Sequence, residues 1–182
     1  SDLKLNIVDS TNNYAAKYLK QTKIPFGTVI MAQYQTDGKG QVDSVWNANK
    51  SDNILMSVIL DTSFLSVNRI FYLSKIVSLS IHESLNSFDI GNVFIKWPND
   101  IFVNKDKIAG ILIENQWKGL SLISSIVGIG INVNQTVFPE SYNATSLKLL
   151  KSKTYSLDEV LEKIIARMNY NFGLLNNLSF DK

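Results

Sequence analysis

The sequence predicts an α+β fold in which a mixed, largely antiparallel β-sheet is backed by helices. Short apolar and β-branched segments typical of strands recur along the whole chain, whereas few segments show helical periodicity. Few of the predicted helices stand between strands as crossovers, and two strand segments in the second half are separated by a tight turn, which favours antiparallel pairing. A length of 182 residues is typical of one domain.

The first half of the chain is expected to hold strands, one helix and one long loop. Asp9-Ser10-Thr11-Asn12 is a run of residues that favour helix N-caps, and apolar residues at helical spacing follow it. Segment 36–53 is polar and contains glycines, and a loop of about 18 residues is long enough to indicate a function. We expect strands over Leu3–Val8, Thr28–Gln33 and Ile54–Leu60.

The second half is expected to hold two helices and two pairs of strands. Apolar residues repeat at helical spacing through Leu65–Phe88 and again through Asp158–Tyr170. The strands are expected to form one short pair and one long hairpin, namely Val93–Lys96 with Ile101–Val103, and Ile108–Asn115 with Leu120–Val133.

Composition excludes several kinds of site and partner. The chain has no cysteine, which rules out disulfides, Cys-based zinc sites and a thiol nucleophile. A net charge of +2 is too small to indicate bulk binding to nucleic acid or membranes. No apolar run approaches the ~18 residues of a transmembrane helix, and the N-terminal residues lack a secretory signal pattern. We therefore expect a cytoplasmic protein that binds neither DNA nor a membrane.

The basic residues are unusually biased toward lysine. Arg69 and Arg167 are the two arginines, and the other 16 of the 18 basic residues are lysines. An anion site in this chain would therefore use lysine point charges, backbone N–H groups or helix N-termini rather than bidentate guanidinium groups.

Two segments combine glycines with polar residues beside a predicted strand. In segment 33–40, Gly38 and Gly40 flank Lys39 and could expose successive backbone N–H groups to a phosphate, although Asp37-Gly38 is equally a common hairpin turn. In segment 128–134, two glycines within a strand indicate either a β-bulge or a flat surface against which a ligand packs.

Two further segments bring lysines together with carboxylates. In Lys96-Trp97-Pro98-Asn99-Asp100, the lysine could stabilise charge on a transferring phosphoryl group, and the carboxylate could bind Mg²⁺ or accept a proton. In segment 105–110, Lys107 follows a turn and precedes two small residues that allow close approach of a ligand. The alternatives are a strand-ending turn with a capping aspartate and a solvated hairpin tip, respectively.

Taken in order, these segments resemble the catalytic domain of biotin–protein ligases. The resemblance covers about residues 7–147, and its most specific part is Lys-Trp-Pro-Asn-Asp followed by Lys-Ile-Ala-Gly-Ile-Leu. The matching segments are Asp9-Ser10-Thr11-Asn12, Gln35 with Gly38-Lys39-Gly40 and Trp46, Lys96–Asp100, Lys107–Leu112 and Gly128–Asn132.

The resemblance implies an enzyme that activates biotin with MgATP to biotinyl-5′-adenylate and then transfers biotin to a lysine of a biotin carboxyl carrier protein. It implies that Lys96 and Lys107 converge on the α-phosphate and that Asp100 binds Mg²⁺ or acts as a base. Biotin contacts would come from Ser10, Thr11, Asn12, Gln35, Gly38, Lys107, Gly110, Gly128 and Gly130. Nucleotide contacts would come from Lys39, Gly40, Gln41, Trp46, Lys96, Asn99 and Asn132.

Segment 38–46 departs from the family pattern, which is commonly Gly-Arg-Gly-Arg-x-Gly-Arg-x-Trp. Here Lys39 replaces the first arginine, Asp43 stands where glycine is usual, and Ser44 stands where arginine or asparagine is usual. Lysine does not reproduce a bidentate guanidinium contact, and Asp43 adds negative charge near the phosphates. We expect the 36–53 loop to fold over the adenylate and exclude water, but to retain it loosely.

The resemblance also predicts which domains the chain contains, and it leaves alternative functions open. No helix-turn-helix pattern precedes Leu3, and Lys182 comes where the family usually continues with a small β-barrel domain. We therefore expect one catalytic domain over residues 1–182 without either neighbour, and an exposed sheet edge would permit a homodimer. The alternatives are a lipoate or octanoate ligase or transferase, whose usual Arg-Arg-x-x-Gly-Gly stretch is absent, and a non-catalytic protein that binds biotin or its adenylate.

Overall fold

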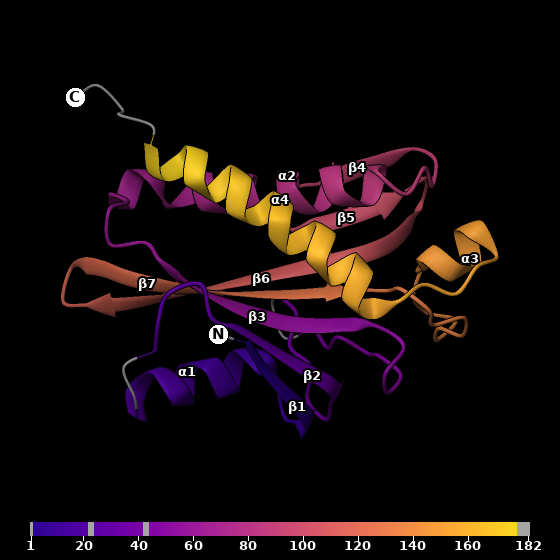
Figure 1. Ribbon diagram of the computed structural model, residues 1–182, viewed down its shortest axis with the longest axis horizontal. Helices are drawn as coiled ribbons and strands as arrows, with labels where there is room; N and C mark the ends of the chain where they lie inside the picture. Colours follow the sequence, from indigo (N-terminus) through magenta and orange to yellow (C-terminus); the bar gives the residue numbers. More distant parts are fainter. Residues whose placement is uncertain (1, 22–23, 42–43, 178–182) are drawn as a thin grey trace.

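The computed structural model describes residues 2–21, 24–41 and 44–177, and it confirms the predicted α+β class (Figure 1). Seven strands form one sheet in the order β1-β2-β3-β7-β6-β5-β4. Only β1 and β2 pair in parallel among these described strands, and the other pairs are antiparallel. The strands are β1 (Asp2–Val8), β2 (Val29–Gln35), β3 (Ile54–Asp61), β4 (Val93–Lys96), β5 (Asp100–Val103), β6 (Asp106–Lys118) and β7 (Ser121–Ile131).

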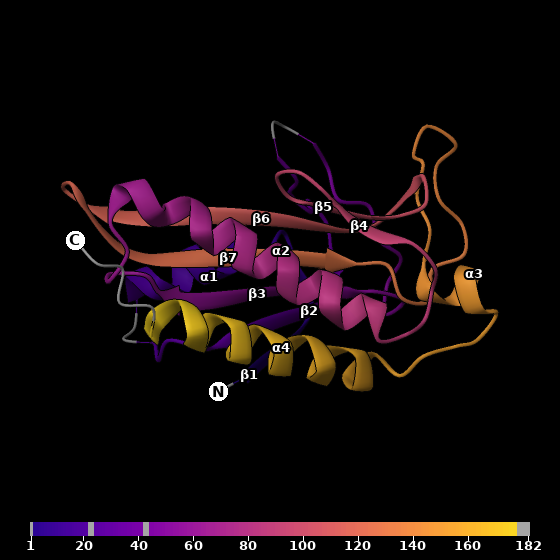
Figure 2. The same cartoon turned by 90° about the horizontal axis from the view of Figure 1, so that it is seen from above.

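Helices cover both faces of this sheet. Figure 1 shows α2 (Ile70–Asn86) and α4 (Leu157–Asn177) above it and α1 (Thr11–Gln21) below it. In Figure 2, α2 and α4 run side by side over the strands, with the short α3 (Leu147–Lys151) at one end. Within the described part of the chain, no helix combines the length and the apolarity needed to cross a bilayer.

The central strand β3 shows why helices pack on both faces of the sheet. Its sequence, Ile-Leu-Met-Ser-Val-Ile-Leu, is a nearly continuous apolar run, as expected for a strand that is covered on both faces. Met56, Val58 and other even-numbered residues pack into the core beneath α2 and α4, whereas Ile59 packs with Ala15 of α1 on the opposite face. Ser57 is the exception in this run, and it is fully buried on the α1 face.

The structure corrects two details of the sequence-based expectations and decides between two alternatives for a third. The helix expected from Leu65 begins at Ile70, because residues 62–69 form turns and a short 3-10 helix, η1 (Val67–Arg69). Helix α3 was not expected, and its N-terminus is capped by the Ser146 hydroxyl, which accepts the Leu149 N–H. The β3–β7 register is unbroken from Ile54 to Asp61, so the paired glycines of β7 form a flat stretch and not a bulge.

Candidate functional site

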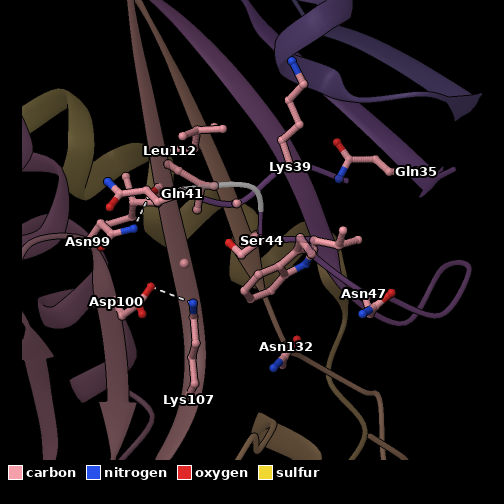
Figure 3. Close-up of a pocket in the computed structure, with 18 of the residues that line it drawn as sticks. Gln35, Lys39, Gln41, Ser44, Asn47, Asn99, Asp100, Lys107, Leu112 and Asn132 are labelled. Atoms are coloured by element: carbon pink, nitrogen blue, oxygen red, sulfur yellow. Dashed lines mark hydrogen bonds and ion pairs between the residues drawn. The ribbon is translucent and has the colours of Figure 1, made fainter. Parts of the chain in front are cut away.

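A pocket of about 300 Å³ lies on the α1 face of the sheet, beside the N-terminus of α1. Its floor contains Gly110 of β6 and Gly128 and Gly130 of β7, and Gly110 is directly opposite Gly130 in the antiparallel register. Loop residues between β2 and β3 and between β7 and α3 complete its walls, and Figure 3 shows the side chains that project into it.

The glycines of the floor permit side chains to lie directly on the sheet. A Cβ atom at Gly130 would collide with the indole ring of Trp46, and one at Gly110 would lie 2.9 Å from Cζ3 of the same ring. A Cβ atom at Gly128 would collide with the carboxamide of Asn12. Glycine is therefore required at these positions for close approach and not for a positive φ.

The inner end of the pocket is made of buried polar residues. Because β1 and β2 are parallel, their C-terminal ends lie side by side, which brings the first residues of α1 next to Gln35. The Thr11 N–H and hydroxyl lie 2.7 and 3.1 Å from Gln35 Oε1. Ser10, Thr11 and Asn12 are each at most 3% exposed, so hydrogen-bonding groups line a desolvated end of the pocket.

A charged pair lies farther along the floor. Lys107, near the start of β6, forms an ion pair of 2.7 Å with Asp100, the first residue of β5, and Figure 3 shows the two side chains pointing toward each other. Lys107 Nζ also lies 5.5 Å from the ring centroid of Trp46. Both side chains of the pair are partly exposed. A cation and a carboxylate are thus held at the pocket floor, accessible to a ligand.

Asn99 and Asn132 have different environments at this end. Asn99 directly precedes β5 and is bonded to the interior of β6, because its Nδ2 donates to the Ile111 carbonyl at 3.0 Å and its own carbonyl accepts the Ile111 N–H. Asn132 is buried, yet its Oδ1 has no partner among the described residues. Since a buried acceptor without a donor is unfavourable, this oxygen is suited to accept a hydrogen bond from a ligand.

The loop between β2 and β3 folds back as a small irregular hairpin over the pocket. The Trp46 N–H donates to the Gly38 carbonyl at 2.8 Å, and the Gly40 N–H donates to the Ser44 carbonyl at 2.7 Å. Gln41 and Ser44 are exposed and line the pocket. Asp43, to which the sequence assigned unfavourable negative charge, lies outside the described residues.

All but two of the predicted site residues line this pocket, and the exceptions are Gly38 and Lys96. Gly38 is buried behind the loop, where an added Cβ would lie 3.0 Å from Gln35 Nε2. Lys96 lies on the edge strand β4, and its Nζ is 5.0 Å from the centroid of the Phe102 ring. The expected convergence of Lys96 and Lys107 in one pocket is therefore not seen, because β4 lies two strands away from β6 and Lys96 packs on an aromatic ring.

Some of the predicted residues line the pocket with their polar groups already occupied. The Asn12 carboxamide contacts Ser57, Glu114 and the Leu112 carbonyl.

In Figure 3 the Lys39 ammonium points away from the Lys107–Asp100 pair. Among the described residues, Lys39 and Lys107 are the two cations that line the pocket, so its positive charge is modest.

Sequence reasoning missed one whole wall of the pocket. Segment 138–144 contributes side chains to it, and its end is held against Lys107 by two backbone hydrogen bonds, from Lys107 N–H to Asn143 and from Thr145 N–H to Lys107, each of 2.9 Å. The sequence of this segment has no strand or helix periodicity and no family motif. Only its position directly after the Gly128–Asn132 strand could have indicated it.

The described residues contain no cluster of three or more His, Cys, Asp or Glu side chains placed to hold a metal ion. Asp100 is the carboxylate of the pocket among these residues, and it is paired with Lys107. A single partly exposed carboxylate fits an ion such as Mg²⁺ that arrives with substrate phosphates, because such sites use one or two protein carboxylates. It does not fit a metal site built from protein ligands alone.

Comparison with known proteins gives relatives for both the sequence and the structure. The bifunctional ligase/repressor BirA of Bacillus spizizenii is 32% identical over 164 residues, which are 88% of this chain and 50% of that protein. The biotin–[acetyl-CoA-carboxylase] ligase of Mycobacterium tuberculosis is 31% identical over 124 residues, covering 66% of this chain and 45% of the relative. The chain thus spans about half the length of these curated relatives.

Among solved structures, the biotin protein ligase from Aquifex aeolicus in complex with biotin and ATP superimposes with a TM-score of 0.85 at 30% identity. The match covers 99% of this chain and 73% of that one. A sequence profile of the biotin/lipoate A/B protein ligase family matches residues 5–132, which is well over half of the chain. The chain therefore belongs to the biotin/lipoate A/B protein ligase family.

Proposed function

We propose that this domain is a biotin–protein ligase, which converts biotin and MgATP to biotinyl-5′-adenylate and then joins biotin to a lysine of a carrier protein. The observation that carries this proposal is the presence, in one glycine-floored pocket, of a buried polar end at Thr11 and Gln35 and of an accessible charged pair at Lys107 and Asp100. The names of the relatives support the same activity.

The buried polar end favours biotin over lipoate. Biotin carries a ureido group with two N–H donors and a carbonyl acceptor, and a buried group of this kind needs partners. Ser10, Thr11 and Gln35 supply them. The dithiolane ring of lipoate has no such donors or acceptors, and each buried polar group left unpaired against it would cost about 1–3 kcal/mol.

The charged pair suits the activation step. The biotin carboxylate attacks the α-phosphorus of ATP, a carboxylate–phosphorus bond forms, and the bond to pyrophosphate breaks. Both reactants are anionic, so the Lys107 ammonium would reduce their repulsion and stabilise the charge that develops on the α-phosphate. Mg²⁺ bound with the triphosphate would supply further charge stabilisation, with Asp100 as its protein carboxylate.

The nucleotide would occupy the end formed by the loops. The indole of Trp46 offers an aromatic face to a base, and the unpartnered Oδ1 of Asn132 is placed to accept the exocyclic amine of adenine. In the second step the carrier lysine attacks the acyl carbon and AMP leaves. We assign acceptance of the amine proton to Asp100, whose carboxylate lies 2.7 Å from Lys107 Nζ and is accessible from the pocket.

Incubation of the purified protein with biotin, MgATP and an apo biotin carboxyl carrier domain tests the proposal. We expect biotin-dependent release of pyrophosphate and addition of one biotinyl group to the carrier, measured by a coupled phosphate assay and by mass spectrometry. Absence of both in the presence of tight biotin binding would instead identify a non-catalytic binding protein. Labelling with lipoate but not with biotin would reverse the choice of substrate.

A further inference from the structure

Five polar side chains behind the inner end of the pocket form one continuous hydrogen-bonded row, which we call the Gln35–Glu114 chain. It runs from Gln35, which is bonded to the Thr11 N–H, through the Thr11 hydroxyl, Ser57 and Asn12 to Glu114. The three central members are almost completely buried, with exposed fractions of 3% for Thr11, 0% for Ser57 and 2% for Asn12. Neither Ser57 nor Glu114 lines the pocket among the described residues, and the proposed ligand contacts do not include them.

The protons of this chain can be assigned from Glu114 inward. Asn12 Nδ2 lies 2.7 Å from Glu114 Oε2, and a carboxylate accepts but does not donate, so the amide nitrogen must face it. A second acceptor, the Leu112 carbonyl, lies 3.4 Å from the same nitrogen. The Asn12 oxygen therefore faces Ser57, at 2.6 Å from its Oγ.

One proton then decides the direction of the rest of the chain. Asn12 Oδ1 has no proton, so the single hydroxyl proton of Ser57 must lie on this 2.6 Å contact. Ser57 Oγ is also 2.7 Å from Thr11 Oγ1, and the proton between these two oxygens must then come from Thr11. Gln35 Oε1 then receives the Thr11 N–H at 2.7 Å, and its longer contact of 3.1 Å with the Thr11 hydroxyl carries no proton in this arrangement. The Thr11 hydroxyl thus donates away from the pocket and keeps lone pairs for the ligand.

We propose that Glu114 is a positioning residue. It fixes the direction in which hydrogen bonds are donated along the Gln35–Glu114 chain, and so makes the Thr11 hydroxyl an acceptor for a substrate N–H. This inference rests on the proposed function and deepens it, because the ureido group of biotin is the substrate group with N–H donors. Without the carboxylate, the Asn12 amide can turn over, Ser57 can donate to Thr11, and Thr11 can donate to Gln35. The Thr11 hydroxyl is then no longer fixed as a hydrogen-bond acceptor for the ligand.

The test compares variants of the full protein by calorimetry with biotin and by steady-state kinetics of pyrophosphate release. Glu114→Met keeps the length of the side chain but removes the acceptor, and we expect it to raise the Kd for biotin about tenfold, with kcat at saturating biotin and KM for ATP within about twofold of wild type. Glu114→Gln retains an acceptor and should raise the Kd less than about threefold. Gln116→Met, two residues along β6, is the matched control and should leave the Kd unchanged.

A double-mutant cycle separates this role from a structural one. Ser57→Ala breaks the chain between Glu114 and Thr11, so Glu114→Met added to it should raise the Kd by less than about twofold more. Multiplication of the two single effects, or an unchanged Kd in Glu114→Met, would overturn the inference while leaving biotin ligation intact. Failure of the wild-type protein to bind biotin would overturn the proposed function as well.

A second measurement keeps the inference testable if Glu114→Met does not fold. In ¹⁵N-labelled protein, Glu114→Gln should shift the side-chain amide resonances of Asn12 and leave those of Asn47 in the outer loop in place. Ser57→Ala should also shift the Asn12 resonances. Unchanged Asn12 resonances in both variants would show that the contacts do not form in solution, and the inference would be lost.

Discussion

The two ends of the pocket are built in different ways. The inner end consists of residues of β2, β3 and the start of α1. Ser10, Thr11 and Asn12 are buried there, Thr11 is hydrogen-bonded to Gln35, and Asn12 is hydrogen-bonded to Ser57. The outer end consists of loop residues such as Gln41, Ser44 and Tyr142, which are exposed. Rigid elements thus hold the groups assigned to the ureido ring, and loops hold those assigned to the nucleotide.

This difference indicates where selectivity and retention arise. A preorganised polar end can select its ligand before ATP arrives, because little ordering is needed on binding. An outer end made of exposed loops must order around the nucleotide, and the cations that line the pocket among the described residues are Lys39 in such a loop and Lys107 at the boundary of this end. We therefore expect tight and selective recognition of biotin but weaker retention of the adenylate. Substitutions at each end test this difference.

The largest effect is expected at the boundary between the two ends. Lys107→Ala should lower the rate of adenylate formation by about 10²–10³-fold, because the ammonium faces the site where phosphate charge develops. It should also weaken biotin binding, since the same group attracts the ground-state carboxylate. Biotin-dependent pyrophosphate release measures the first effect and calorimetry the second. Lys105→Ala, in the exposed turn before β6, is the control, and a loss below about tenfold in Lys107→Ala would remove Lys107 from the chemical step.

The floor glycines allow the two ends to be perturbed separately. Gly128→Ala would push against the Asn12 carboxamide, and we expect about 30-fold weaker biotin binding together with about 1–3 kcal/mol of lost stability. Gly130→Ala would push against the Trp46 indole, and we expect a higher KM for ATP with a smaller change in biotin affinity.

Gly173→Ala controls for the loss of glycine itself, because a Cβ there meets nothing within 4 Å. It should stabilise α4 by about 0.5–1 kcal/mol, measured by thermal unfolding. Equal effects of the two floor variants on biotin and ATP would show that the ends do not act independently.

A smaller effect is expected from Lys96. The family resemblance assigns it to the α-phosphate, but its ammonium lies over Phe102 outside the pocket. We expect Lys96→Ala to reduce the rate of adenylate formation at most about tenfold and to leave biotin affinity unchanged, as measured in the same two assays. A loss as large as that of Lys107→Ala would mean that the side chain moves into the pocket when ATP binds.

Retention of the adenylate can be increased by a substitution at the outer end. Gln41 is exposed, lines the pocket and occupies the position of the second arginine of the family pattern. Gln41→Arg would add a guanidinium that can contact a phosphate through two N–H groups, and we expect release of biotinyl-adenylate to slow about threefold. Filter-binding chase with labelled adenylate measures this rate. Unchanged release would show that retention is not limited by missing arginines.

The smallest effect concerns Asp9, which precedes α1. Its pKa is lowered by the Asn13 side-chain amide and by the Ser10 N–H, with a weaker contribution from Lys39. Because its pKa is lowered by folding, ionised Asp9 stabilises the fold at pH values above its pKa in the unfolded state, about 3.9. This contribution is lost as the pH falls through the pKa of the folded state. Because Asp9 is exposed, Asp9→Asn should cost only a fraction of 1 kcal/mol at pH 7. Urea unfolding at pH 7 and near pH 2 should show this difference disappearing in acid.

The sequence predicted the strands well because their signals are local. Alternation and β-branched runs gave β1 through β7 with small errors at the ends, and the N-cap run at Asp9–Asn12 gave the start of α1. Family motifs then indicated most of the residues that line the pocket. Both kinds of information are contained in short stretches of chain.

What the sequence could not predict depends on tertiary packing. Segment 138–144 has no periodicity of its own and reaches the pocket through backbone bonds to Lys107. The position of Lys96 depends on strand order, because β4 and β5 must be placed before its distance from Lys107 is known. Ser57 lies in an apolar run and Glu114 in a strand, and their connection through Asn12 appears only when α1, β3 and β6 are brought together.

Calorimetry with biotin and with lipoate, each in the absence of ATP, tests the account most directly. If the buried polar end is preorganised for a ureido group, biotin should bind the nucleotide-free protein and lipoate should bind at least about 100-fold more weakly, a difference of about 2.7 kcal/mol. Lipoate binding that equals or exceeds that of biotin, or biotin binding that requires ATP, would contradict it.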